Sequence, residues 1–325
     1  MLDECLQAVE RTSRGQALLV GGEAGVGKTA LIRRFCDEHC ESARILWGAC
    51  DPLFTPSPLG PLRAVGEEIG GELDKVVTKG AMPHTVVTAL ARALSARAPT
   101  VFVLEDAHWA DEATLDVLRL LARTVETVPT LGRGQHRDDE LDRTHPLRVL
   151  IGELATSRAV GRLKLARLSP TAVARLAEPY GVDADTLYRK TSDNAFFVVE
   201  ALATGAEGIP DTVRDAVLAR AARLSPVARA LLDGVAVPPR AELWLLEALA
   251  GPPAGALDEC LASGMLVAES AAVAFRHELA RLAVEDSIPP HRKVDLHRTA
   301  LAALADPLGK ALDLARLAHH AEGCG

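Results

Sequence analysis

The chain has 325 residues, of which 48% are hydrophobic, and this length is sufficient for two or three domains with apolar cores. Its formal net charge of −8 excludes a general electrostatic attraction to DNA or to anionic lipid. Arg, Asp or Glu interrupts the apolar runs within about a dozen residues, and the amino-terminal stretch is acidic and unlike a leader. We therefore expect a soluble, cytoplasmic protein that does not span a membrane and does not bind DNA directly.

The six cysteines are scattered along the chain, at positions 5, 36, 40, 50, 260 and 324. Because the chain is long and lacks a leader, a disulfide framework is not expected, and the thiols are predicted to be free. Cys36, His39 and Cys40 offer metal-binding atoms over a short stretch, but a second close pair of ligands is missing. Ordinary helix packing is the favoured interpretation of these three residues.

The first chemical motif lies between an apolar run and a helix-like sequence. Gly22, Gly25, Gly27, Lys28 and Thr29 fit the phosphate-binding loop (P-loop) pattern of glycine, four residues, glycine, lysine and threonine. Glycines allow positive φ and bring backbone N–H groups against phosphates, and the following helix directs its positive end at them. Lys28 is predicted to reach the β and γ phosphates, and the Thr29 hydroxyl to coordinate Mg²⁺. The motif therefore predicts binding of ATP or ADP with Mg²⁺, with a chance glycine turn as the alternative.

A pair of carboxylates follows a later apolar stretch. Glu105 and Asp106 end the predicted strand 101–104, where a P-loop protein needs an acid for its metal. One of them is expected to hold Mg²⁺ through water, and the other to orient or deprotonate the attacking water. The alternative is a buried strand with a solvated acidic end. A little further on, Asp111 is predicted to cap the next helix.

The coarse pattern of elements changes along the chain. Strands are predicted at 17–20, 44–47, 101–104 and 162–165, with helical patterns between them. This alternation is typical of an α/β domain with a parallel sheet. From a helix start at Ser169, the spacing of apolar residues becomes helical through Arg223. Short helices then lead to two predicted strands at 265–268 and 272–275, which we interpret as a wing, and Pro238 and Gly251 begin predicted turns.

Several segments together resemble the ATPase region of the large LuxR-type regulators, which belong to the signal-transduction ATPases called STAND. Residues 105–116 read Glu-Asp-Ala-His-Trp-Ala-Asp-Glu-Ala-Thr-Leu-Asp. The other matching segments are 47–52, 58–63, 137–142, 145–147, 209–214 and 275–279. The resemblance implies a P-loop NTPase core with a five-stranded parallel sheet, an all-α lid, a winged-helix domain and helical repeats. Its boundaries are 1–168, 169–208, 209–300 and 301–325, and the family's DNA-binding helix-turn-helix does not follow here.

The resemblance also implies a mechanism. In this family ADP holds the lid and the winged helix closed on the core, and exchange for ATP opens the molecule for assembly. Arg137 matches the arginine that senses the nucleotide, and His277 matches the winged-helix histidine that contacts the ADP phosphate. The alternatives are a loop salt bridge for Arg137 and a structural hydrogen bond for His277. The winged helix is expected to pack against protein, because the one small basic cluster, around Arg292, does not form a recognition helix.

The sequence departs from the family at three places. Glu105 stands where Asp is usual, which leaves open how it shares the work with Asp106. The lid has Asp-Asn-Ala-Phe-Phe at 193–197 where the family has Gly-Asn-Pro-Phe-Phe, and this change is expected to loosen the lid. The fourth strand should be continuously apolar, but 128–136 contains glycines, Arg133 and a histidine. We predict that this segment is loop-like or poorly paired, and that hydrolysis and nucleotide sensing are weakened.

These observations favour a regulatory switch that binds ATP or ADP, hydrolyses ATP slowly and assembles with itself or with partner regulator subunits. A conventional ATPase that drives remodelling or loading is the second hypothesis. An inert fragment that keeps only the fold is the third.

Overall fold

The computed structural model describes residues 1–51, 57–97, 99–137, 141, 144–205, 208–238, 241–251, 254–270, 272–305 and 313–324. The chain forms two compact units, Met1–Ala166 and Arg167–Gly325, and each is described by itself. The division falls two residues before the boundary predicted for the ATPase core. Pro52, residues 138–140 and 142–143, and parts of the predicted turns at 239 and 252–253 lie outside the described residues.

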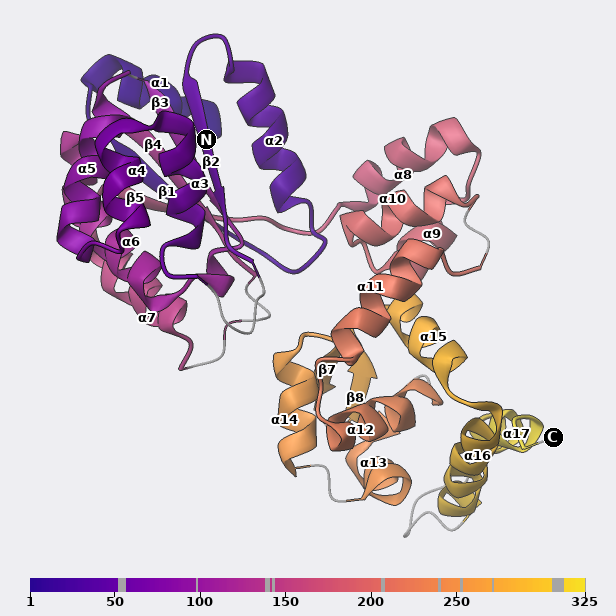
Figure 1. The fold of residues 1–325 in the computed structure, drawn as a ribbon. Coiled ribbons are helices and arrows are strands. Elements are labelled where there is room, and N and C mark those ends of the chain that lie inside the picture. The colour runs from indigo at the N-terminus through magenta and orange to yellow at the C-terminus, as the bar shows by residue number, and fades with distance from the viewer. Residues whose placement is uncertain are drawn as a thin grey trace. The chain divides into compact units, whose positions relative to one another are not determined.

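The first unit is built on a five-stranded parallel sheet with the order β2-β3-β4-β1-β5 (Figure 1). The strands are β1 Gln16–Gly21, β2 Arg44–Ala49, β3 Thr100–Glu105, β4 Thr130–Gln135 and β5 Val160–Lys164. All neighbouring strands pair in parallel. The predicted α/β fold of the P-loop NTPase type, with five parallel strands, is confirmed. Each of the four strands located from sequence overlaps an observed one.

Helices cover both faces of this sheet. One face carries α1 Leu2–Thr12 and α2 Lys28–His39, and the other carries α3 Gly60–Ile69, α4 Gly71–Thr78, α5 Pro83–Ser95, α6 Glu112–Thr124 and α7 Pro146–Glu153. Short 3-10 helices lie at η1 Ala107–Trp109, η2 Val125–Thr127 and η4 Leu154–Thr156. In β3, Val101 and Val103 join the core under α1 and α2, whereas Phe102 and Leu104 join the opposite cores. A strand buried on both faces needs this uninterrupted apolar sequence.

The segment predicted to be loop-like is in fact the central strand β4, so that prediction is wrong. Arg133 pairs in register with Leu18 of β1 and with Val103 of β3. Pairing on both sides satisfies the peptide groups, which is the largest requirement of a buried strand. The Arg133 side chain is 2% exposed, and its guanidinium carbon lies 3.6 Å from the centroid of the Phe35 ring. This cation–π contact offsets part of the unfavourable free energy of burying the charge.

The buried guanidinium of Arg133 remains poorly satisfied. Among the described residues, none of its three nitrogens has a hydrogen-bond partner. Burial lowers the pKa of Arg133 to about 10. The sheet therefore holds a desolvated positive charge directly beneath the helix that follows the phosphate-binding loop.

The glycines of β4 leave a cavity on the opposite face of the sheet. Gly132 and Gly134 lie on this face, and helices α6 and α7 cover it. The cavity has a volume of about 70 Å³ and is lined mainly by apolar side chains, among them Phe102, Leu118 and Leu147. It exists because two neighbouring positions of the central strand carry no side chain.

The second unit begins with helices, as predicted for the lid. They are α8 Pro170–Ala177, η5 Glu178–Tyr180, α9 Ala184–Thr191, α10 Ala195–Ala203 and α11 Asp211–Ala221. Ser169 caps α8, because its hydroxyl accepts a hydrogen bond from the Ala172 amide at 3.1 Å. A small core that includes Val173, Leu187 and Val198 holds the first helices together.

The turn at 192–194 forms without the glycine and proline that the resemblance leads one to expect there. Ser192 and Asp193 have positive φ angles of 47° and 58°. Asp193 is held by Arg167 at 3.3 Å and by the Tyr188 hydroxyl at 3.1 Å. Asn194 then caps α10 through the Phe196 amide. Side-chain contacts thus fix a geometry that glycine and proline would otherwise favour.

The rest of the second unit combines helices with a small antiparallel sheet of order β6-β8-β7. Its elements are α12 Pro226–Ala236, β6 Ala241–Glu242, α13 Leu243–Ala250, α14 Ala254–Ala262, β7 Leu266–Glu269, β8 Ala272–Phe275, α15 Glu278–Ser287, α16 Pro290–Ala305 and α17 Leu314–Glu322. The two strands predicted at 265–268 and 272–275 are observed as β7 and β8. The domain boundary predicted at residue 300 falls inside α16.

Two further findings concern the cysteines and the lengths of the helices in both units. The six cysteines all lie within the described residues and are free. In the part of the chain that the structure describes, no helix has the length and apolar character needed to cross a membrane.

Candidate nucleotide-binding site

The glycine-rich loop connects the end of β1 to the start of α2 at Lys28. Gly22, Gly25 and Gly27 have φ angles of 153°, 75° and 103°, a region that favours glycine. A Cβ atom on Gly22 would lie 3.0 Å from the Leu165 carbonyl oxygen. This backbone, together with the amino terminus of the 12-residue helix α2, forms a site for phosphate oxygens. The loop geometry fits the nucleotide that the motif predicts.

Lys28 lies across the same loop. Its side chain is buried, and its ammonium group donates to the carbonyl oxygens of Gly22 and Glu23, both at 2.7 Å. The positive charge is therefore held at the loop where the motif predicts phosphate. A flexible four-carbon stem lets the ammonium move from these carbonyls to phosphate oxygens.

A hydrogen-bonded network joins the loop to the end of β3. The Thr29 hydroxyl donates to Oε1 of Glu105 at 2.7 Å. The Trp47 indole N–H donates to Oε2 of the same carboxylate at 3.0 Å. Thr29 and Glu105 thus present a hydroxyl and a carboxylate side by side, and such hard oxygen ligands suit Mg²⁺. These two residues fit the predicted metal ion and would hold it directly or through water.

Asp106 points to different partners from Glu105. It has a left-handed backbone conformation with φ 50° and ψ 45°, which is uncommon for a residue other than glycine. Its Oδ1 lies 4.0 Å from Nε of Arg137 and 3.9 Å from Nδ1 of His108. The bend therefore separates the two acids: Glu105 faces the loop threonine, and Asp106 faces Arg137. Asp111 caps α6 through the Thr114 amide, as predicted.

Sequence reasoning missed Gln135, the last residue of β4. Its side chain is buried, and its amide Nε2 donates to the Thr29 hydroxyl at 3.1 Å. A polar residue at the end of a strand beside β1 is the signal that would have identified it. Because residues 128–136 were predicted not to form a strand, Gln135 was not recognised as a residue at the end of one.

His277 lies in the second unit, whereas the other eight predicted site residues lie in the first. It directly precedes α15, is 8% exposed and packs on Phe197 with 4.8 Å between ring centroids. Burial, together with the positive charge of Arg167, Arg276 and Arg220, lowers the pKa of His277 to about 3. The ring is therefore neutral near pH 7. Among the described residues, its Nδ1 atom has no hydrogen-bond partner.

Comparison with known proteins shows that the amino-terminal part of the chain is similar to an ATPase domain. Residues 1–132 match the family model of the AAA ATPase domain. An uncharacterised protein of Rhizobium meliloti (strain 1021) is 24% identical over 96% of the chain, and the chain spans 37% of that relative.

Two solved structures are similar to this chain. The Walker-type ATPase of Pyrococcus abyssi superposes with a TM-score of 0.56 and 13% identity, covering 87% of this chain and 95% of that one. A STAND protein with a tetratricopeptide repeat sensor from Pyrococcus horikoshii has a TM-score of 0.42 and 15% identity, covering 99% and 47%. Residues 1–132 therefore match an AAA ATPase domain, and the first unit has the P-loop NTPase fold, which the structure from Pyrococcus abyssi supports.

Proposed function

Given this ATPase domain, we propose that the chain is a regulatory switch that binds ATP or ADP with Mg²⁺ and hydrolyses ATP slowly. It would form the nucleotide-handling part of a STAND regulator of the large LuxR type. In this proposal ADP holds the second unit against the core, and ATP releases it for assembly with further copies or partner subunits. Since the chain spans 37% of its matched relative, the activity of a longer protein belongs to the proposal as well.

The observation that carries the switch is the environment of His277. A buried nitrogen without a hydrogen-bond partner is uncommon in proteins, and Nδ1 of His277, which has none among the described residues, lies in a region of positive charge from Arg167, Arg220 and Arg276. An anion would be attracted by the arginines, and its negative charge would favour a protonated ring that donates a hydrogen bond from Nδ1. Phosphate-recognising groups in both units are what a switch needs if one nucleotide is to hold the units together. For nucleotide binding without regulation, phosphate-recognising groups in one unit would suffice.

The contacts of the two acids support slow hydrolysis. Both oxygens of Glu105 accept hydrogen bonds, from Thr29 and from Trp47, so this carboxylate is suited to organising the metal. A general base needs a lone pair directed at the attacking water. Asp106 is the remaining candidate for that role, but its Oδ1 lies 4.0 Å from Nε of Arg137, and this ion pair competes with the attacking water for the lone pairs of the carboxylate.

The nucleotide that co-purifies with the protein tests this proposal. We expect bound ADP in the wild-type protein, little nucleotide in Lys28→Ala, and a raised melting temperature when ADP is added to stripped wild-type protein. His277→Ala is expected to release ADP faster while the loop still binds ATP, and His291→Ala, an exposed histidine of α16, is the matched control. Stripped wild-type protein that neither ADP nor ATP stabilises would refute the proposal.

A conventional ATPase is the second candidate, because the family match concerns the ATPase domain itself. The two candidates differ in turnover. Multiple turnovers above about one per second, with rapid ADP release, would favour the enzyme over the switch. In that case His277→Ala would leave the rate unchanged.

A further inference from the structure

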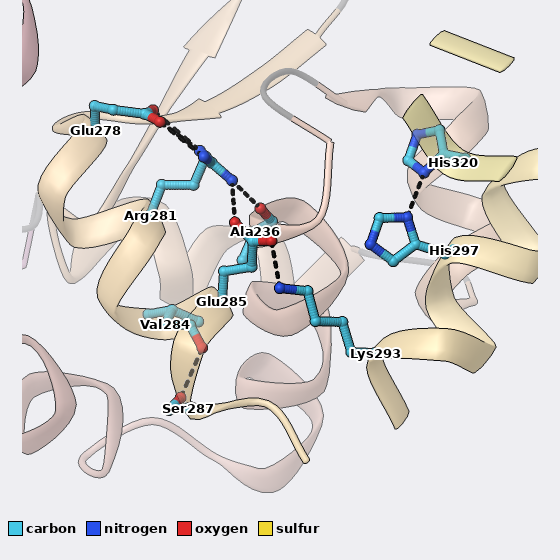
Figure 2. A network of polar contacts seen from close by, with 9 residues as sticks. All are labelled: Ala236, Glu278, Arg281, Val284, Glu285, Ser287, Lys293, His297 and His320. Atoms are coloured by element: carbon cyan, nitrogen blue, oxygen red, sulfur yellow. Dashed lines mark hydrogen bonds and ion pairs between the residues drawn. The ribbon is translucent and has the colours of Figure 1, made fainter. Parts of the chain in front are cut away.

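Three histidines gather where the last two helices of the second unit meet. His297 comes from α16, and His319 and His320 come from α17. One ligand atom from each side chain can be chosen so that all three lie within 4.8 Å of one another. Figure 2 shows the rings of His297 and His320 facing each other, with 3.1 Å between their Nδ1 atoms.

We propose that His297, His319 and His320 form a binding site for a divalent transition-metal ion, with Zn²⁺ as the expected occupant. Imidazole nitrogen suits zinc, copper, nickel and iron, whereas Mg²⁺ and Ca²⁺ prefer oxygen. The site is thus distinct in its chemistry from the Mg²⁺ site of the ATPase domain.

The distance between the two buried histidines supports shared coordination. Two nitrogens bound to one tetrahedral zinc at about 2.0–2.1 Å lie about 3.3 Å apart. The observed 3.1 Å between Nδ1 of His297 and Nδ1 of His320 is close to this value. Without an ion, one of the two nitrogens must carry the proton of a hydrogen bond. With an ion, both can present their lone pairs to the same centre.

The three histidines differ in how exposed their side chains are, and this difference suits a metal site. His297 and His320 are 4% and 1% exposed, so their rings are held by packing, whereas His319 is exposed and free to adjust. Burial lowers the pKa of His320 to about 4 and lowers that of His297, which keeps both rings in the neutral form that binds metals. The exposed side gives the ion a path of entry and a fourth position for water.

The ion would fasten α17 to the rest of the unit. This helix has nine residues, too few to be stable in isolation. Its other ties are an ion pair from Arg316 to Glu242, at 2.8 and 2.9 Å, and the packing of Leu317 against Leu245 and Ala300. A metal that bridges α16 and α17 would add coordinate bonds to the packing that already joins these two helices.

Metal titration of the 325-residue protein tests the site. The protein is stripped with chelator, kept in excess Mg²⁺ to saturate the oxygen sites, and titrated with Zn²⁺ by calorimetry and with Co²⁺ by visible absorption. We expect one equivalent to bind, a raised melting temperature, and a Co²⁺ spectrum typical of nitrogen ligands. His319→Gln and His320→Gln should each weaken binding at least about tenfold. His291→Gln, on the exposed face of α16, should bind as the wild type does.

The opposite results overturn the proposal. They are the absence of saturable binding, equal affinity in wild type and in His319→Gln, equal loss in His291→Gln, or thiolate bands that assign the Co²⁺ to cysteine. If circular dichroism finds His320→Gln unfolded, the exposed His319→Gln decides the question by itself.

Discussion

Strands β3 and β4 lie side by side in the middle of the sheet, and each pairs on both edges. β3 reads Thr-Val-Phe-Val-Leu-Glu, as a buried parallel strand should, whereas β4 reads Thr-Leu-Gly-Arg-Gly-Gln. Two strands that are both paired on each edge therefore carry very different side chains. The comparison teaches that backbone pairing places the strand, and that unsuitable side chains leave their effects in the layers above and below it.

Those effects are a buried charge on one face and a cavity on the other. Arg133 lies over Phe35 without a hydrogen-bond partner among the described residues, and Gly132 and Gly134 border the cavity under α6 and α7. The two strands converge again at their carboxyl ends. There Glu105 of β3 and Gln135 of β4 both bind the Thr29 hydroxyl.

The largest effect is expected from truncating β3. Phe102→Ala removes a buried ring that already borders the cavity, so little can relax into the space. We expect a loss of about 3–5 kcal/mol in the free energy of unfolding, measured by urea denaturation. Val149→Ala, at an exposed position, is the control and should change it by less than about 0.5 kcal/mol. A loss below about 1 kcal/mol for Phe102→Ala would mean that β3 is no better packed than β4.

Arg133→Met should change the free energy of unfolding in the opposite direction from Phe102→Ala. Replacing the buried guanidinium with an apolar side chain is expected to raise the free energy of unfolding by roughly 1–3 kcal/mol, although the contact with Phe35 is lost. Arg34→Met, at an exposed position, should have little effect. A clearly destabilised Arg133→Met would mean that the arginine has a favourable role in the sheet.

The same variant predicts a pH dependence. Burial lowers the pKa of Arg133 to about 10 in the folded protein, well below its value in the unfolded chain, so between these two pKa values the unfolded chain binds more protons. Wild-type stability should therefore rise with pH relative to Arg133→Met. The advantage of the variant should be complete below pH 10 and shrink above it. Denaturation at pH 8 and pH 10.5 measures the change, and a constant difference would contradict it.

A smaller effect is expected at the end of β4. Gln135→Leu removes the hydrogen bond to the Thr29 hydroxyl while keeping a similar volume. One such bond contributes about 0.5–1.5 kcal/mol, so Mg²⁺–ATP should bind about two- to tenfold more weakly in calorimetry. Gln7→Leu, exposed on α1, is the control. Equal affinities in wild type and Gln135→Leu would remove β4 from the nucleotide site.

The smallest effect concerns the glycines. Gly132→Ala places a methyl group 3.8 Å from the Ala17 Cβ and beside the cavity, and should stabilise the protein by about 0.4–1 kcal/mol. Gly15→Ala is the contrasting variant, because its Cβ would lie 2.0 Å from the Val128 carbonyl oxygen and must destabilise. Thermal melting distinguishes the two. A destabilised Gly132→Ala would indicate that β4 has no room for a side chain.

The comparison also explains which parts could be predicted from the sequence. Strand β3 and the P-loop were predictable because apolar continuity and glycine spacing are local signals. Strand β4 was not, because its position depends on pairing with β1 and β3, which lie far away in the chain. Gln135 was missed with its strand. Trp47 was also missed, because the bond from its indole to Glu105 depends on the alignment of β2 with β3.

The cavity beneath Gly132 and Gly134 has a consequence for the response of the protein to hydrostatic pressure. A void of about 70 Å³ per molecule corresponds to about 40 mL per mole, and unfolding lets water fill such space. The volume change of unfolding is therefore expected to be more negative than for a sheet filled on both faces. Filling the void at Gly132 should make that volume change smaller, so compression would unfold Gly132→Ala less readily than the wild type.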